Sequence, residues 1–199
     1  MLLLIVGLAL FLGTHLLPTV PELRKSLAAR LGENGYKGLF TVLSLIGLVL
    51  IVIGYGKAQA LAGSKNPVLW DAPVWTRHIA FLIMIPSLVL FVAAYIPSRI
   101  RTAAKHPMLA AIKLWALAHL LANGDLASII LFGSFLAWAV YDRISVKKRG
   151  ALGPLGARQG GLGGDVAAVG IGLAVWAFLL FGGHYLLIGV PLLSVSFAP

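Results

Sequence analysis

The sequence has no cysteine among its 199 residues, and charged residues make up only 11% of it. The absence of cysteine excludes disulfide frameworks, thiolate catalysis and iron–sulfur ligation. Hydrophobic residues make up 60% of the chain, and the mean hydropathy is +0.97. A water-soluble domain could not cover its surface with so few charges. The composition therefore indicates an integral-membrane protein, which we interpret as a single domain over residues 1–199.

Acidic residues are scarce: there are six, against sixteen Lys and Arg. They all lie near the ends of apolar stretches, and no two are spaced to form a general acid–base pair on one helix face. This argues against glycosidase-like or carboxylate-bridged dinuclear metal chemistry. The sequence also lacks the Gly-x-Ser-x-Gly, His-Glu-x-x-His and dinucleotide-binding fingerprints. A bound metal would therefore depend on the five histidines or on isolated carboxylates.

Six charge-free stretches predict an all-α polytopic transmembrane helical bundle. They are residues 2–21, 38–56, 78–98, 114–124, 126–141 and 166–199. A hydrocarbon core of ~30 Å needs about 20 helical residues, which the first three and the last can supply. The fourth and fifth are shorter and meet at Asn123-Gly124-Asp125, where Asn-Gly indicates a turn and Asp125 a helix N-cap. We therefore expect these two segments to form a short helical hairpin.

The positions of Lys and Arg predict the orientation of the chain. Thirteen of the sixteen lie in the first, third and fifth loops, and only Lys57, Lys65 and Arg77 lie on the other side. Because Lys and Arg accumulate on the cytoplasmic side, both termini are expected outside. The first stretch lacks a preceding basic segment and a following small-residue cleavage site, which predicts an uncleaved anchor. This loop pattern also explains the basic pI, so the lipid bilayer is the expected partner and nucleic acid is not.

Three shorter patterns predict local structure. A leucine at every fourth position between Pro21 and Gly32 predicts a short interfacial helix. The cytoplasmic loop over residues 143–165 is rich in glycine and basic residues, and without a Gly-Lys-Ser/Thr sequence it predicts a flexible linker and no phosphate cradle. Small residues at every fourth position over residues 164–172 predict close packing against another helix.

Histidines inside the apolar stretches are the candidate functional residues. His15 lies within the first stretch, and His119 lies one turn after Trp115 with the small residues Ala116 and Ala122 beside it. A neutral imidazole is an axial ligand for haem iron, so two facing histidines with an aromatic neighbour would suit a b-type haem. The alternative is structural: an imidazole bonded to a neighbouring helix or reaching the interface, and alanines that only allow close packing.

The other histidines are weaker candidates. His106 precedes Pro107 and suits the start of a helix on the cytoplasmic side, although it could also bind a ligand. His78 and His184 lie near the outer ends of their stretches, and His184 is the better candidate of the two. If residues 114–124 cross the membrane fully, His15 and His106 are the better-placed pair. If Lys113 marks the cytoplasmic interface, His119 lies ~9 Å deeper, comparable with His15.

At these positions the chain resembles the NnrU family of bacterial membrane proteins, whose plant and cyanobacterial relative is the 15-cis-zeta-carotene isomerase. The similarity covers nearly the whole chain. It is carried by residues 11–17, 24–32, 39–40, 44–45, 54–55, 69–70, 106–107, 115–125, 132–133, 138, 184 and 188–191.

The resemblance implies a multi-pass protein of the bacterial inner membrane, so that both termini would be periplasmic. It also implies a link to denitrification, with nitrite or nitric oxide reductase components as partners. In the isomerase branch two histidines hold a b-type haem, and by motif they fall on His15 and His119. These two residues would be the metal ligands here, with His106 and Trp115 as further candidates for contact with the cofactor.

Our leading hypothesis is therefore a haem-b membrane protein that supports nitrite and nitric oxide respiration as a redox sensor, electron carrier or assembly factor. One alternative is a cofactor-free scaffold for assembling a respiratory reductase. Two others are enzymes: a carotene-isomerase-like protein, and an isoprenylcysteine-methyltransferase-like protein, which Lys105-His106-Pro107 distantly resembles.

Overall fold

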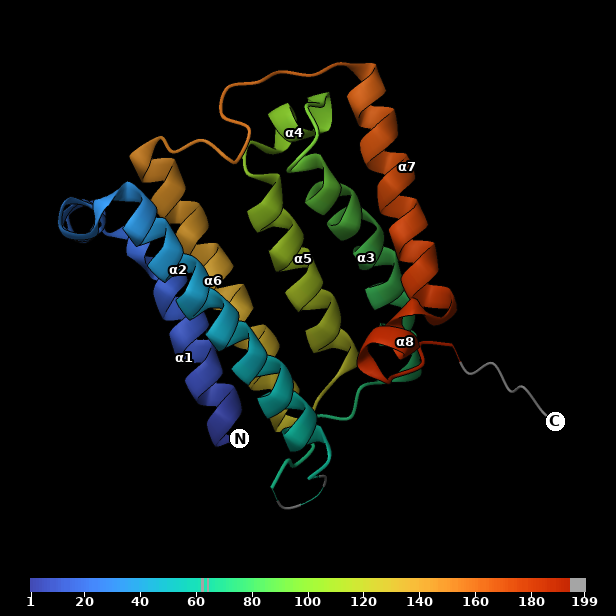
Figure 1. The fold of residues 1–199 in the computed structure, drawn as a ribbon. Helices are drawn as coiled ribbons and strands as arrows, with labels where there is room; N and C mark the ends of the chain where they lie inside the picture. The colour runs from blue at the N-terminus through green and yellow to red at the C-terminus, as the bar shows by residue number, and fades with distance from the viewer. Residues whose placement is uncertain (62, 64, 194–199) are drawn as a thin grey trace. The chain divides into compact units, whose positions relative to one another are not determined.

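The computed structural model describes residues 1–61, 63 and 65–193, and within these residues it is helical without a named strand (Figure 1). Its helical elements are α1 (Leu2–Leu16), η1 (Leu17–Thr19), α2 (Pro21–Gln59), α3 (Val74–Ala93), α4 (Arg99–Ala104), α5 (Pro107–Ala122), α6 (Leu126–Arg149), α7 (Leu162–Phe178), the π-helical turn η2 (Leu179–Gly183) and α8 (His184–Ile188). The expected all-helical fold is confirmed.

Five helical segments among the described residues are long and apolar enough to cross a membrane. They are Leu2–Thr19, Pro21–Gln59, Val74–Ala93, Leu126–Arg149 and Leu162–Ile188. The sixth apolar helix, α5, has 16 residues, which cover ~24 Å at 1.5 Å per residue, less than the ~30 Å of hydrocarbon. The end of the last predicted segment, residues 194–199, lies outside the described residues.

The prediction of a short hairpin needs correction, because both of its helices extend beyond the charge-free stretches. Lys113 lies inside α5, and Asp142 lies inside α6, which continues to its end at Arg149. The Asp142 carboxylate pairs with the Arg149 guanidinium at 3.5 Å, so these charges do not end the helix. With 24 residues, α6 is long enough to span alone. Since α7 starts at residue 162, the predicted loop 143–165 is also reduced to residues 150–161.

Two compact units make up the chain. The first consists of Met1–Ala80 and Ala116–Ala151, and the second of Phe81–Trp115 and the chain from Leu152 onward. Helices α1, α2 and α6 belong to the first unit, whereas α4 and α7 belong to the second. The boundaries pass through α3 and α5, so each unit is assembled from separate parts of the sequence.

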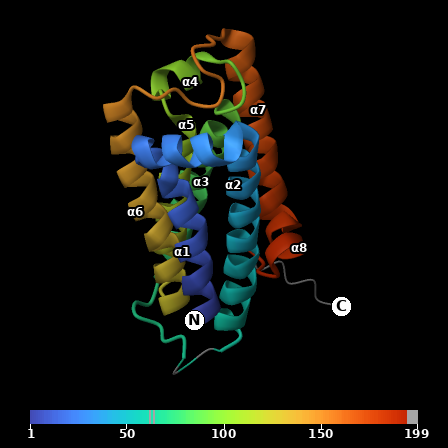
Figure 2. The same cartoon turned by 60° about the vertical axis from the view of Figure 1, so that its left-hand side comes forward.

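Glycines bring α1 and α2 together in the first unit, where the two helices lie side by side (Figures 1 and 2). A Cβ atom on Gly54 would lie 2.3 Å from the backbone nitrogen of Leu4, and one on Gly7 would lie 2.6 Å from that of Ile51. Gly47 makes a similar approach to α1. Such contact maximises van der Waals packing between helices, which is the main attraction left when lipid replaces water. Leu4 is completely buried as a result.

A sharp bend at Gly32 divides α2 into a short first part and a long second part (Figure 2). Gly32 has φ 73° and ψ 158°, a left-handed conformation that costs least for glycine. The part before the bend begins at Pro21 and exposes Leu23 and Leu31. This agrees with the separate amphipathic helix that the leucine spacing predicts.

A polar network joins the end of α2 to the start of α6. Asp125 accepts hydrogen bonds from Gln59 Nε2 at 2.9 Å and from Asn66 Nδ2 at 3.0 Å. It also caps α6 as predicted, accepting from the backbone nitrogen of Ser128 at 3.0 Å and from its hydroxyl at 2.5 Å. Burial raises the pKa of the Asp125 carboxyl, but these hydrogen bonds outweigh it and leave the pKa below its ordinary value. Tyr55 completes the network, with its hydroxyl 2.9 Å from that of Ser128.

The turn between α5 and α6 is bonded to the loop that follows α2. The backbone nitrogen of Leu69 donates to the Gly124 carbonyl at 2.8 Å, and that of Leu126 donates to the Pro67 carbonyl at 3.0 Å. A Cβ atom on Gly124 would overlap the backbone of Trp70, so the turn requires glycine at this position. The Asn-Gly turn is thus where the sequence predicts it.

In the second unit, small residues of α7 pack closely, as their spacing predicts. A Cβ atom on Gly172 would lie 2.8 Å from the Cα atom of Val89 in α3, and one on Gly164 would overlap the Pro97 carbonyl. Ala168, between these two glycines, is completely buried. The spacing therefore marks a helix-contact face.

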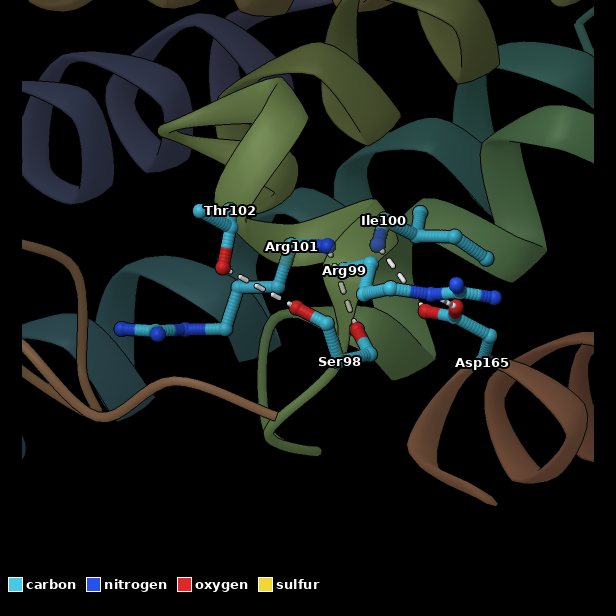
Figure 3. Close-up of polar contacts among 6 residues, drawn as sticks. All are labelled: Ser98, Arg99, Ile100, Arg101, Thr102 and Asp165. Atoms are coloured by element: carbon cyan, nitrogen blue, oxygen red, sulfur yellow. Dashed lines mark hydrogen bonds and ion pairs between the residues drawn. The ribbon is translucent and has the colours of Figure 1, made fainter. Parts of the chain in front are cut away.

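Polar contacts fix α4 against the start of α7 (Figure 3). The Asp165 carboxylate accepts from Arg99 Nε at 2.5 Å and from the backbone nitrogen of Ile100 at 3.0 Å. Ser98 caps α4 by accepting from the backbone nitrogen of Arg101 at 3.1 Å. The buried Arg101 guanidinium donates to the carbonyl oxygens of Arg158 and Gly156. Arg101 therefore holds the glycine-rich segment through two of that segment's backbone carbonyls. Its composition predicts a freely flexible linker instead.

Candidate functional site

His15 is held near the end of α1 by a hydrogen bond to its own helix. Its Nδ1 atom lies 2.8 Å from the carbonyl oxygen of Phe11, one turn earlier. Because a carbonyl can only accept, Nδ1 carries the hydrogen, and a neutral ring then has its lone pair on Nε2. The imidazole also stacks on the Phe11 ring, with centroids 4.2 Å apart and planes at 26°. Ring and tautomer are therefore fixed in the way that is typical of metal-ligating histidines.

Aromatic residues of α6 form a line of ring contacts beside both candidate histidines. Phe132, Phe135 and Trp138 follow one another at three-residue spacing. The Trp138 ring meets His15 edge-on at 5.8 Å, and the Phe132 ring stacks on His119 at 4.4 Å and 25°. We call these three residues the α6 aromatic line.

The ring contacts place the two histidines at different levels of α6. Phe132 and Trp138, their respective partners, are six residues apart, which corresponds to ~9 Å along the helix axis. His15 and His119 both belong to the first unit, and both are partly buried. The structure therefore brings them to one aromatic line at separate positions along it.

Polar atoms without partners occur on the two helices that pack against His15. Within the described residues, Tyr36 Oη, Ser44 Oγ and Trp138 Nε1 are buried and form no hydrogen bond. Trp138 contacts His15 directly, and the other two lie on the part of α2 that carries Phe40, whose ring centroid is 5.1 Å from that of His15. Buried polar groups are nearly always satisfied, so three orphaned groups near one histidine indicate a place where a polar ligand or ordered water belongs.

An open pocket of about 270 Å³ adjoins this cluster. It is lined by Pro18, Arg24, Tyr36, Lys37, Phe40 and Thr41. The Arg24 guanidinium lies over the Tyr36 ring at 5.4 Å and pairs with Glu33 at 3.1 Å. The pocket thus shares Tyr36 and Phe40 with the surroundings of His15.

The remaining predicted site residues lie in the second unit or near its ends. His106 precedes α5 as predicted, and its carbonyl accepts from the backbone nitrogen of Ala110 at 3.2 Å. Trp115 lies in α5, one turn before His119, at the boundary between the units. His184 begins α8, and its Nδ1 atom bonds to the Val190 carbonyl at 2.7 Å.

The sequence reading missed the pocket residues of α2. Tyr36, Phe40 and Ser44 recur at four-residue spacing, which places them on one helix face. Lys37 is the last charge before residues 38–56 and so marks the end of the apolar section. Both patterns can be seen in the sequence. Neither of them shows that Phe40 on this face contacts His15, because that contact depends on how α1 packs against α2.

No group of three or more His, Asp or Glu residues gathers to hold a metal ion among the residues that the structure describes. The His15 environment supplies one imidazole, fixed aromatic rings and unsatisfied polar atoms. A haem iron is held mainly by its porphyrin ring, so it would need no more than one or two imidazoles from the chain.

The structure is that of an all-helical membrane protein in which the partly buried His15 of α1 contacts aromatic rings of α2 and α6. The chain belongs to the NnrU family, because the family model described as NnrU protein matches residues 3–192. The resemblance seen in the sequence is therefore confirmed over almost the whole chain. No curated protein and no solved structure matches the chain.

Proposed function

We propose that this NnrU protein binds a b-type haem through His15 and His119. In this proposal it supports nitrite and nitric oxide respiration in the bacterial inner membrane, as a redox sensor or as an electron-transfer or assembly component. The observation that carries the proposal is the environment of His15: its ring is fixed through Nδ1, and the neighbouring Trp138 has a buried indole nitrogen without a hydrogen-bond partner. Bound haem would supply one-electron exchange between ferric and ferrous iron.

The residues fit this group best at His15. The Phe11 carbonyl holds the imidazole in the tautomer that leaves Nε2 for a metal, and Phe11 and Phe40 supply the apolar contacts that a macrocycle needs. His119 is similarly oriented by stacking on Phe132. Since the two rings contact α6 at levels ~9 Å apart, ligation of one iron by both requires them to move together.

An absorption spectrum tests the proposal directly. Protein purified from its own membranes in mild detergent is expected to show a Soret band that sharpens on dithionite reduction, together with b-type visible bands. The variants His15→Ala and His119→Ala should lose these bands, whereas His184→Ala, which removes a histidine of the second unit, should keep them. Loss in His106→Ala with retention in His119→Ala would instead assign the second ligand to His106.

A featureless spectrum, with haem supplied during expression, would reject the cofactor. The remaining candidate would be the cofactor-free assembly scaffold. Growth on nitrate without oxygen separates the two functions, because the haem proposal predicts that His15→Ala impairs growth as much as deletion does. A scaffold predicts normal growth of that variant with normal levels of the protein.

A further inference from the structure

The pocket beside His15 has the composition of an anion site. Of its six lining residues, Arg24 and Lys37 are cationic, and none is acidic. No ion pair holds Lys37 within the described part of the chain. Glu33 pairs with Arg24, but 40% of the arginine side chain and 55% of the glutamate side chain are exposed. A pair this exposed is weak, so Arg24 can exchange Glu33 for a stronger anion.

Tyr36 supplies a second, independent sign of a ligand. Only 6% of its surface is exposed, yet its hydroxyl has no hydrogen-bond partner among the described residues. The Arg24 guanidinium lies over the Tyr36 ring, and both residues line the pocket. An anionic oxygen in this pocket would accept from the phenol and remove the cost of burying it unpaired.

The pocket lies where α2 changes from charged to apolar. Residues 33–37 follow the bend at Gly32 and end with Lys37, and residues 38–56 carry no charge. Beyond the pocket, α2 exposes large apolar side chains: Leu39, Val42, Leu45, Ile46 and Val49. In a membrane protein this transition occurs at the level of the lipid headgroups, with the exposed apolar side chains facing the acyl chains.

We propose that the pocket binds the headgroup phosphate of one anionic phospholipid. Arg24 and Lys37 neutralise the phosphate, and Tyr36 donates a hydrogen bond to it. The acyl chains lie along the exposed apolar face of α2. Inorganic phosphate shares the headgroup chemistry but not the chains, so the two ligands can be separated by experiment. The proposal stands without haem, because none of these three residues is a proposed ligand of iron.

Native mass spectrometry of the full chain in mild non-ionic detergent tests this lipid site. During titration with dioleoyl-phosphatidylglycerol we expect one tightly bound lipid, and much weaker binding of dioleoyl-phosphatidylcholine. Lys37→Gln and Arg24→Gln should each weaken the phosphatidylglycerol complex about fivefold, the effect of one cation near a lipid surface. Tyr36→Phe removes only the hydroxyl and should weaken it about tenfold, as for a hydrogen bond to a charged group.

Lys148→Gln is the matched control, because it removes the charge of another exposed lysine, at the end of α6. It should leave binding unchanged. Equal affinity for the two lipids, or equal weakening by Lys148→Gln and Lys37→Gln, would overturn the proposal in favour of general surface attraction. Complete displacement of the lipid by millimolar inorganic phosphate would overturn it in favour of a free anion. If Arg24→Gln fails to fold, Lys37→Gln and Tyr36→Phe still decide the question.

Discussion

Polar side chains of the first unit fall into two groups that differ in how well they are satisfied. In the group around Asp125, every partner donates to the carboxylate or to the Ser128 hydroxyl, and the network joins two helix ends. In the group around His15, Tyr36 and Trp138 have donors without acceptors. Fully satisfied networks stabilise a fold, whereas orphaned groups need an additional partner. We therefore assign a structural role to the first group and a binding role to the second.

Asp125→Asn should destabilise the protein and change how its stability depends on pH. The carboxyl pKa is lowered in the folded state, so Asp125 contributes stability above its unfolded pKa of about 3.9, and this contribution is lost as pH falls through the folded value. Melting of the wild type in detergent should therefore decline below about pH 4. Near neutral pH the variant should lose about 1 kcal/mol, typical of one side-chain hydrogen bond, because an asparagine oxygen can still cap α6 but its NH2 group cannot accept from the Ser128 hydroxyl.

Asp71→Asn is the control for this measurement, because Asp71 is exposed and makes none of these contacts. It should melt like the wild type throughout. If Asp125→Asn shows the same acid decline as the wild type, another carboxylate is responsible and the structural role of Asp125 is wrong.

At the scale of helices, close approach is set by which glycines face a neighbour. Gly54 and Gly56 lie in the same turn of α2, but only Gly54 meets the backbone of α1. A Cβ atom at position 54 would lie 2.3 Å from Leu4, and one at position 56 would have nothing within 4 Å. The pair therefore separates the effect of packing from the effect of glycine on helix stability.

Gly54→Ala should lower the melting temperature of the purified protein, because α1 must move away from α2 to admit the methyl group. The cost is expected to be about 1–3 kcal/mol, as for other overpacked contacts. Gly56→Ala should be neutral or stabilising, since alanine favours a helix by about 1 kcal/mol over glycine. Equal melting of the two variants would show that this glycine contact does not hold α1.

Most of the helices could be predicted from hydropathy, and their ends only in part. Charge-free runs located every long helix, and Pro21 and Asp125 marked a start and a cap, whereas Gly32, predicted to end a short helix, is a bend within α2. Charges did not mark the ends of α5 and α6, because Lys113 is carried within one helix and Asp142 pairs within the other. The four-residue spacing on α7 predicted a contact face but could not name Val89 and Pro97 as its partners.

Residues of the candidate site could be predicted only where the sequence of a single helix is enough to identify them. His15 and His119 were identified as intramembrane histidines, and haem binding by them stays a prediction. The pocket could not be predicted, because it forms only when the bend in α2 brings Arg24 beside Tyr36. Contacts between residues far apart in the chain depend on how the helices pack, and the spacing of residues along one helix does not reveal this.

For the whole molecule, the number of crossings decides where the termini lie. With α5 as a sixth crossing both termini share one side, whereas five crossings would separate them. Hydrogen bonds from Leu69 to Gly124 and from Leu126 to Pro67 hold the turn after α5 on the side where α2 ends. If α3 crosses the membrane from that side, a return through the short helix α5 is the expected sixth crossing. Bilayer thinning and a snorkelling Lys113 would accommodate a crossing helix of this length.

We therefore expect both termini in the periplasm and residues 150–161 in the cytoplasm, with the basic loops inside. Alkaline phosphatase, which is active only outside the cytoplasm, should be active when fused at either terminus and inactive when inserted at Gly153. Green fluorescent protein, which folds in the cytoplasm, should give the opposite pattern. Reversing the charge of the Lys147-Lys148-Arg149 sequence should weaken this orientation, whereas neutralising Lys65 should not. Termini on opposite sides would show that α5 does not cross the membrane.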